Sequence, residues 1–232
     1  MTPPTQPVVA VLVAAGSGSR LGAALPKALV ALDGVTLVRR SADALVAGGV
    51  ERLVVTIPAG FEAHFDEALA GVQAPVTRVV GGATRQDSVR LGLAALDVVD
   101  GAVVLVHDAA RALVPSSVVR SITQAIADGS DAAVPVVPVV DSIRRVTDSG
   151  SVVVDRTPLR AVQTPQAARL GALRDAHARA AADGVEATDD AAVCEHAGLT
   201  VTLVPGHRDS LKITEPADLI LAAAILHERR NA

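Results

Sequence analysis

Short runs of β-branched and apolar residues alternate along this chain with segments of helical periodicity. Such alternation predicts an α/β fold with crossover connections and a mostly parallel sheet. Helices should cover both faces of the sheet, because the strand sequences are continuously apolar. The predicted strands are residues 8–13, 53–57, 76–80, 103–106, 132–136 and 200–204. The predicted helices are residues 37–47, 61–70, 88–96, 116–127, 168–182, 189–197 and 216–229.

The segment from 136 to 156 interrupts this alternation, because no helical pattern separates its two extended runs. Residues 139–146 and 151–156 flank the turn sequence Thr147-Asp148-Ser149-Gly150 and predict a β-hairpin. Two strands alone are marginally stable and leave their edges unpaired. We therefore expect one domain over residues 1–232, with an arm at about 137–157 that packs on another surface. A second copy of the chain is the natural candidate, which would make a homodimer.

Composition argues against several classes of partner. The net charge is −4 and the chain has two Phe and no Tyr or Trp, so neither a positive field nor stacking aromatics favour nucleic acid. No apolar run approaches the roughly eighteen residues that cross a bilayer, and residues 1–7 lack the basic start of a signal peptide. We expect a cytoplasmic protein without a membrane partner. Cys194 is the only cysteine, so an intrachain disulfide is excluded, and its apolar neighbours favour burial.

The first predicted strand leads into a glycine-rich turn that contains Gly16 and Gly18, followed by Arg20 and Lys27. Glycines let backbone N–H groups approach a polyphosphate, and the two cations can neutralise its oxygens. The spacing matches neither the P-loop nor the dinucleotide fingerprint. Two glycines alone are also compatible with an ordinary flexible loop, but the added Arg and Lys favour a phosphate site at the carboxyl end of this strand.

Four further blocks accompany the glycine-rich turn in a fixed order. They are Gly81-Gly82-Ala83-Thr84-Arg85-Gln86-Asp87-Ser88, His107-Asp108-Ala109-Ala110-Arg111, Thr164-Pro165-Gln166 and Asp209-Ser210-Leu211-Lys212-Ile213-Thr214. With Ala14-Ala15-Gly16, Arg20 and Lys27, the chain resembles the 2-C-methyl-D-erythritol 4-phosphate cytidylyltransferases from about residue 8 to 226. The resemblance implies a Rossmann-like nucleotidyltransferase fold whose protruding β-arm embraces a second subunit.

The resemblance also implies an activity. Enzymes of this family join CTP to the phosphate of methylerythritol phosphate and release pyrophosphate, with Mg²⁺. A phosphate monoester is already anionic near neutral pH, so this chemistry needs preplaced cations rather than a general base. Two alternatives stay open at this point: a related ribitol phosphate cytidylyltransferase, and a non-catalytic nucleotide-binding regulator. The absence of Arg20 or Lys27 would favour the regulator, and both are present.

By the family's pattern, site residues fall into three sets. The catalytic residues are Arg20 and Lys27, which stabilise the transition state, and Arg156 and Lys212, which position the attacking phosphate. The residues expected to bind CTP are Ala14, Ala15, Gly16, Gly18, Gly82, Ser88 and Asp108. The residues expected to bind the polyol phosphate are Asp108, Arg111, Ser142, Arg156, Thr164, Thr188 and Lys212. Asp108 is also the expected metal ligand, with Mg²⁺ held mainly through phosphates.

Some residues depart from the family's pattern or have structural interpretations. Ala83 stands where many members carry an acidic residue, which leaves the Gly82 backbone and Ser88 to recognise the base. Ser142 replaces the usual Thr and keeps its hydroxyl. We interpret His107 as a core or strand-end histidine and Asp87 as a helix N-cap.

Overall fold

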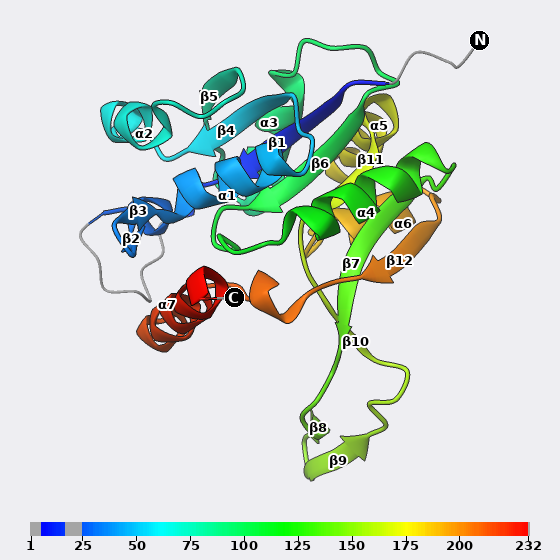
Figure 1. Cartoon of the computed structure of the whole chain (residues 1–232). Coiled ribbons are helices and arrows are strands. Elements are labelled where there is room, and N and C mark those ends of the chain that lie inside the picture. Colours follow the sequence, from blue (N-terminus) through cyan, green and yellow to red (C-terminus); the bar gives the residue numbers. More distant parts are fainter. Residues whose placement is uncertain (1–5, 17–24, 232) are drawn as a thin grey trace.

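The fold is a twisted eight-stranded sheet covered by helices on both faces (Figure 1). It was obtained as a computed structural model, in which residues 6–16 and 25–231 are described. The strands of the sheet are β1 (Val8–Val13), β4 (Arg52–Ile57), β5 (Val76–Val80), β6 (Val103–Asp108), β7 (Ala132–Pro138), β10 (Arg160–Val162), β11 (Gln166–Arg169) and β12 (Val201–Pro205). All six strands predicted from the sequence are present, with ends that differ by at most two residues.

The sheet is parallel except at β10 and β11. Its strand order is β10-β7-β11-β6-β1-β4-β5, and β12 pairs with β7 in parallel. The short strand β11 inserts antiparallel between β6 and β7. Sequence analysis was wrong here, because it placed residue 168 in a helix that begins only at Leu170. The two alanines of β11 favour helix locally, but pairing with strands on both sides overrides that weak preference.

Helices form two layers with separate apolar contacts. The helices are α1 (Leu37–Ala47), α2 (Glu62–Leu69), α3 (Arg85–Ala94), α4 (Ser116–Ala127), α5 (Leu170–Ala182), α6 (Asp190–His196) and α7 (Pro216–Asn231). Leu12 of β1 packs with α1, α2 and α4 on one face, while Val11 packs with α3, α5 and α6 on the other. Cys194 lies in this second layer and is buried, as expected. Consecutive residues of one strand therefore enter opposite cores, as a doubly covered sheet requires.

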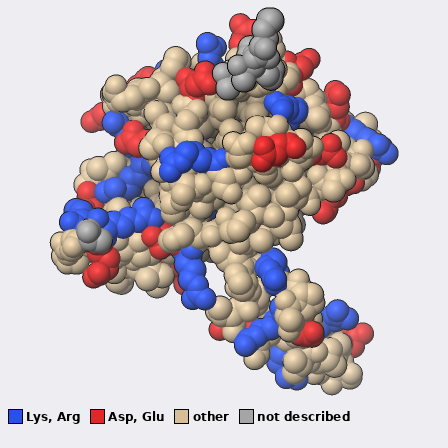
Figure 2. All heavy atoms as spheres, turned by 45° about the vertical axis from the view of Figure 1, so that its right-hand side comes forward, with Lys and Arg blue, Asp and Glu red and all other residues tan. Residues whose placement is uncertain are grey.

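The predicted arm is present and stands away from the body of the molecule (Figures 1 and 2). It consists of β8 (Ile143–Thr147) and β9 (Gly150–Val154), paired antiparallel around a two-residue turn. Its side chains are largely exposed, including Val146 at 83% and Val153 at 68%. The arm therefore lacks a core of its own within this chain.

The remaining elements complete the edge of the fold near the glycine-rich turn. The 3-10 helix η2 (Lys27–Leu29) precedes a small hairpin of β2 (Ala31–Leu32) and β3 (Val35–Thr36), while η3 (Arg208–Ser210) precedes α7. Leu32, Leu37, Leu113 and Ile213 form a cluster on which α7 packs. Within the described ranges, none of the helices combines the length and the apolarity that crossing a membrane would require.

Candidate active site

The main pocket opens at the carboxyl ends of the parallel strands. The hydrogen-bond ladder continues beyond the strands, with Ala14 N bonding Thr56 O at 2.9 Å, Ala109 N bonding Val13 O at 3.0 Å and Gly81 N bonding Ile57 O at 2.8 Å. The loops after β1, β5 and β6 consequently leave the sheet in fixed positions. This edge of a parallel sheet is where ligand crevices form.

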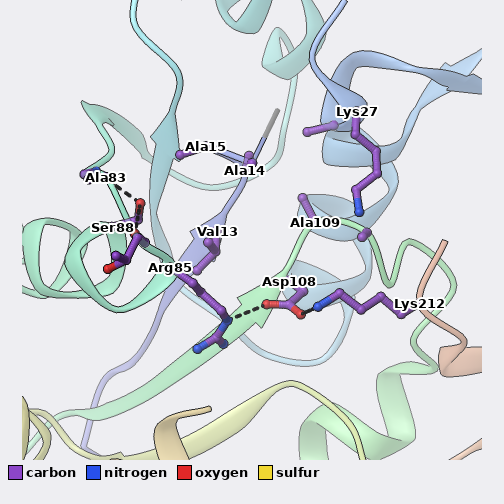
Figure 3. Close-up of a pocket in the computed structure, with 15 residues that line it drawn as sticks. Val13, Ala14, Ala15, Lys27, Ala83, Arg85, Ser88, Asp108, Ala109 and Lys212 are labelled. Carbon is purple, nitrogen blue, oxygen red and sulfur yellow. Dashed lines mark hydrogen bonds and ion pairs between the residues drawn. The ribbon is translucent and has the colours of Figure 1, made fainter. Parts of the chain in front are cut away.

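The pocket has a volume of about 450 Å³ and is open to solvent (Figure 3). Predicted site residues from five separate segments meet in its wall, together with neighbours that sequence analysis did not single out. The wall consists of Val13, Ala14, Ala15, Gly16, Lys27, Ala28, Gly82, Ala83, Thr84, Arg85, Ser88, Asp108, Ala109, Ala110 and Lys212. Gly18 and Arg20, two further predicted residues, lie outside the described residues.

One side of the pocket is a tight turn between β5 and α3. A Cβ on Gly81 would lie 2.4 Å from Ala15 Cβ, and one on Gly82 would lie 2.3 Å from Asp87 Cβ, so only glycines fit. Ser88 Oγ accepts a hydrogen bond from Gly82 N at 3.1 Å and donates one to Thr84 O at 3.0 Å. The Gly82 N–H and the Ser88 hydroxyl proton are therefore engaged within the protein, which leaves oxygen acceptors to face a ligand.

Helix α3 begins three residues earlier than predicted. Thr84 is its N-cap and accepts from Asp87 N, while the Thr84 hydroxyl donates to Asp87 Oδ2 at 2.9 Å. The interpretation of Asp87 as the N-cap was therefore wrong, because Thr84 is the N-cap and Asp87 is the third residue of the helix. The pattern Thr84-x-x-Asp87 in the sequence was the signal for this earlier start.

Asp108, the last residue of β6, lies between two cations at the floor of the pocket (Figure 3). Its Oδ1 bonds Arg85 Nε at 3.0 Å and its Oδ2 contacts Lys212 Nζ at 2.8 Å. Arg85 also donates from Nη2 to Asp190 Oδ2 at 2.8 Å, and Asp190 Oδ1 lies 3.1 Å from His177 Nε2. Five residues from five segments thus form one chain of ion pairs and hydrogen bonds beneath the pocket.

The charges of this network stabilise one another. Burial alone would raise the pKa of Asp108, but Arg85 and Lys212 outweigh burial and hold that pKa well below its usual range. Burial opposes the charge of Arg85 as well, yet Asp190 and Asp108 raise its pKa. Asp108 is therefore an anion throughout the neutral pH range, and Arg85 is a cation.

A smaller pocket of about 180 Å³ adjoins the first and shares Arg85, Asp108 and Lys212 with it. Its other wall residues are Arg111, Val162, Gln163, Thr164, Gln166, Thr188 and Asp189. Arg111 donates to Ser210 O at 2.7 Å and to Val162 O at 3.2 Å, which orients its guanidinium group. Burial and the neighbouring Arg85 lower the pKa of Arg111, while Asp108 opposes them. Among the described residues, the two pockets together hold the predicted site residues at the carboxyl ends of β1, β5 and β6.

His107 supports the floor from below and is fully buried. Thr164 Oγ1 accepts from Asp108 N at 3.0 Å, so its hydroxyl proton is available to His107 Nδ1 at 3.1 Å. The opposite ring nitrogen, Nε2, can then donate to Arg111 O at 3.3 Å. This arrangement suits a neutral imidazole, and burial lowers the His107 pKa to about 4. His107 is a structural residue of the strand end, as the sequence predicted.

Two predicted site residues lie away from both pockets. Ser142 immediately precedes β8 and Arg156 follows β9, so both belong to the arm, where Arg156 Nη1 bonds Val140 O. Conversely, sequence analysis omitted Arg85 and Asp190 from the site, although Arg85 belongs to the motif that begins at Gly81. Their roles depend on contacts that span 23 and 105 positions of the sequence.

Comparisons with known proteins agree with this geometry. The family model described as 2-C-methyl-D-erythritol 4-phosphate cytidylyltransferase matches residues 8–228. A protein of that name from Saccharopolyspora erythraea is 48% identical, covering 94% of this chain and 99% of the relative. One from Rhodococcus jostii is 46% identical, with 96% of each chain covered. The crystal structure of the enzyme of that name from Thermus thermophilus superposes with a TM-score of 0.78 and 38% identity, covering 94% of this chain and 98% of the other.

Proposed function

Since the chain belongs to the 2-C-methyl-D-erythritol 4-phosphate cytidylyltransferase family, we propose that its two joined pockets bind CTP and the sugar phosphate side by side. The enzyme transfers a cytidylyl group from CTP to 2-C-methyl-D-erythritol 4-phosphate, in isoprenoid precursor biosynthesis. The products are pyrophosphate and 4-diphosphocytidyl-2-C-methyl-D-erythritol. We also propose that the reaction takes place in the cytoplasm.

The observation that best supports this proposal is the wall that both pockets share. Arg85, Asp108 and Lys212 line the 450 Å³ pocket and the 180 Å³ pocket alike. The larger pocket suits a nucleoside triphosphate, since it combines the backbone of 14–16 with Gly82 and Lys27. The smaller pocket, with Arg111, Thr164 and Thr188, suits the polyol phosphate. The attacking phosphate and the α-phosphate would then meet at the shared wall.

The chemistry joins two anions, so the protein lowers the barrier mainly by placing positive charge. The sugar phosphate oxygen attacks the α-phosphorus of CTP, the bond to the β-phosphate oxygen breaks, and pyrophosphate leaves. Lys27 borders the triphosphate pocket, whereas Lys212 borders both pockets and can hold the attacking phosphate. Each such group typically contributes on the order of 3 kcal/mol to stabilising a transition state.

Asp108 fits the single carboxylate that a phosphate-bound Mg²⁺ needs. It is ionised, its side chain is 10% exposed, and it borders both pockets. Within the described residues no three His, Cys, Asp or Glu side chains gather as a metal site, so the phosphates would supply the other ligands. When bound, Mg²⁺ would neutralise phosphate charge during the transfer.

The arm is proposed to complete the site of a second subunit in a homodimer. Ser142 and Arg156 lie on the arm, outside the pockets that hold the other predicted residues. The exposed Val146 and Val153 give the arm an apolar surface suited to contact with another protein chain. Basic side chains of the arm are visible at the bottom of Figure 2.

Mixed dimers test this shared site. Lys27→Ala and Arg156→Ala subunits are each expected to be inactive as homodimers. In a mixed dimer, one site carries both defects and the other carries neither, so activity should return to about half that of wild type per mixed dimer. No recovery after demonstrated subunit exchange would show that the arm serves its own subunit or that Arg156 is not part of the site.

Substrate identity is tested by pyrophosphate release from CTP with a panel of polyol phosphates. We expect release with 2-C-methyl-D-erythritol 4-phosphate and much slower release with ribitol phosphate. Faster turnover of ribitol phosphate would contradict the assigned sugar site. Nucleotide binding without release of pyrophosphate from CTP in the presence of any of these acceptors would instead indicate a regulator.

A further inference from the structure

The guanidinium group of Arg85 divides one of its edges between two carboxylates. Its Nε–H and an Nη2–H point in the same direction and commonly bind both oxygens of a single carboxylate. Here Nε bonds Asp108 Oδ1 at 3.0 Å, while Nη2 bonds Asp190 Oδ2 at 2.8 Å. Asp190 therefore occupies the position that the second oxygen of Asp108 would otherwise take.

Asp190 itself does not face the substrates. It is the first residue of α6, its side chain is 3% exposed, and it borders neither of the two substrate pockets. His177 of α5 holds its other oxygen at 3.1 Å and is also buried. A buried carboxylate with these two partners is fixed in position, so any effect of Asp190 on the reaction passes through Arg85.

The consequence lies at Asp108. Because Arg85 binds only Oδ1, the Oδ2 atom is available to contact Lys212 Nζ at 2.8 Å. Arg85 and Lys212 carry two positive charges, and Asp108 and Asp190 carry two negative charges. Without Asp190, Nη2 would turn to Asp108 Oδ2, and the carboxylate would be held by Arg85 in the paired geometry that guanidinium groups favour. Lys212 would then share that oxygen with Arg85, which weakens the contact that fixes its ammonium group between the pockets.

We propose that Asp190 is a positioning residue of the cytidyl transfer: by occupying Arg85 Nη2, it keeps Asp108 Oδ2 and Lys212 Nζ together where the two substrate pockets meet. The inference rests on the proposed function of these pockets. It assigns to Asp190 an effect on the sugar phosphate and on transfer, rather than on CTP binding through the glycine-rich backbone.

A double-mutant cycle between Asp190 and Lys212 tests the proposal. Asp190→Ala alone is expected to lower kcat/KM for the sugar phosphate by about tenfold or more, as removal of supporting residues typically does, and to change KM for CTP by less than about threefold. In the Lys212→Ala background the same substitution should cost less than about threefold, because the group that it positions is absent. Losses that multiply independently in the double variant would overturn the proposal.

Cys194→Ala is the matched control. Cys194 lies on the same helix α6 and is buried, and its thiol forms none of the ion pairs and hydrogen bonds that link Lys212, Asp108, Arg85, Asp190 and His177. Its removal should loosen α6 while leaving the kinetic constants unchanged in both backgrounds. If Cys194→Ala reproduced the kinetic loss of Asp190→Ala, the effect would be one of helix stability and the proposal would be wrong.

Asp190→Asn provides the second variant should Asp190→Ala not fold. Its amide oxygen can still accept from Arg85 Nη2, so the kinetic loss should be smaller than for Ala but equally dependent on Lys212. Independent losses with Asn would likewise contradict the proposal. An inactive wild-type enzyme would refute the proposed function, whereas an active wild type with independent losses refutes only the role of Asp190.

Discussion

The buried imidazole of His107 should make this fold sensitive to mild acid. Its pKa is lowered from 6.5 to about 4, chiefly because burial disfavours the charged ring. Between these two values the unfolded chain binds a proton that the folded protein does not. The contribution of the neutral His107 ring to the unfolding free energy is therefore complete above pH 6.5 and is lost as the pH falls towards 4. The difference between the two pKa values corresponds to roughly 3 kcal/mol of unfolding free energy.

His107→Gln isolates this contribution. The amide oxygen of Gln can accept from the Thr164 hydroxyl and its NH₂ can donate to Arg111 O, so the neighbouring polar groups keep partners while the titratable ring is gone. Between pH 7.5 and 4.5, the unfolding free energy of wild type should fall by about 2.5 kcal/mol more than that of the variant. Carboxylates that titrate in the same range contribute equally to both proteins and cancel.

Urea unfolding followed by far-ultraviolet circular dichroism measures both curves, since the chain has no Trp or Tyr whose fluorescence would report unfolding. Protein concentration must be equal at each pH, because association changes apparent stability. Similar urea dependences of the two proteins would support a two-state comparison. If wild type and His107→Gln lost the same free energy between these pH values, the reasoning about a neutral buried ring would be refuted.

Three further predictions concern the substrate pockets. Lys27→Ala should lower turnover by about 10²–10³-fold and change the unfolding free energy by less than about 0.5 kcal/mol, because Lys27 borders the pocket rather than the core. Near-normal turnover of this variant would show that Lys27 is not a catalytic residue. The specificity constant for CTP should exceed that for UTP by about 100-fold or more. The Gly82 N–H and the Ser88 hydroxyl proton are engaged within the protein, so oxygen acceptors are left that match the cytosine amine and repel uracil O4. Equal specificity constants would contradict this reasoning. Gly81→Ala should raise KM for CTP about tenfold, because the new Cβ would lie 2.4 Å from Ala15 Cβ. Gly101→Ala is the control, since its new Cβ meets only the Gln6 side chain. An unchanged KM for CTP in Gly81→Ala would argue against this turn as the base site.

The elements that the sequence predicted well are those with strong local patterns. Strands β1 and β5 and helices α1 and α4 have the predicted bounds, because apolar periodicity and flanking turn residues suffice to define them. The arm was predicted from a turn between two extended runs, and β8 and β9 pair around that turn. Strand β11 was missed because its pairing with β6 and β7 is a property of the assembled sheet.

Local sequence also determined which segments would supply the site. The turn after β1, the Gly81-Gly82 turn and Asp108 all lie at the carboxyl ends of strands, and parallel strands bring these ends to one edge. Lys27 borders the larger pocket, Arg111 the smaller one and Lys212 both, although each comes from a different loop. The motif blocks and the sheet topology together were sufficient to bring these residues to the two pockets, and their roles there stay predictions.

Tertiary structure alone decided how the charges are paired. Nothing local distinguishes Arg85 from Arg90 on the same helix, yet Arg90 pairs with Asp87 at the surface while Arg85 bridges Asp108 and Asp190 under the pocket. The difference arises because burial removes water from Arg85 and its partners, so direct contacts must replace solvation. Such contacts join residues up to 105 positions apart, and only the packing of α3, β6 and α6 brings them within hydrogen-bonding distance.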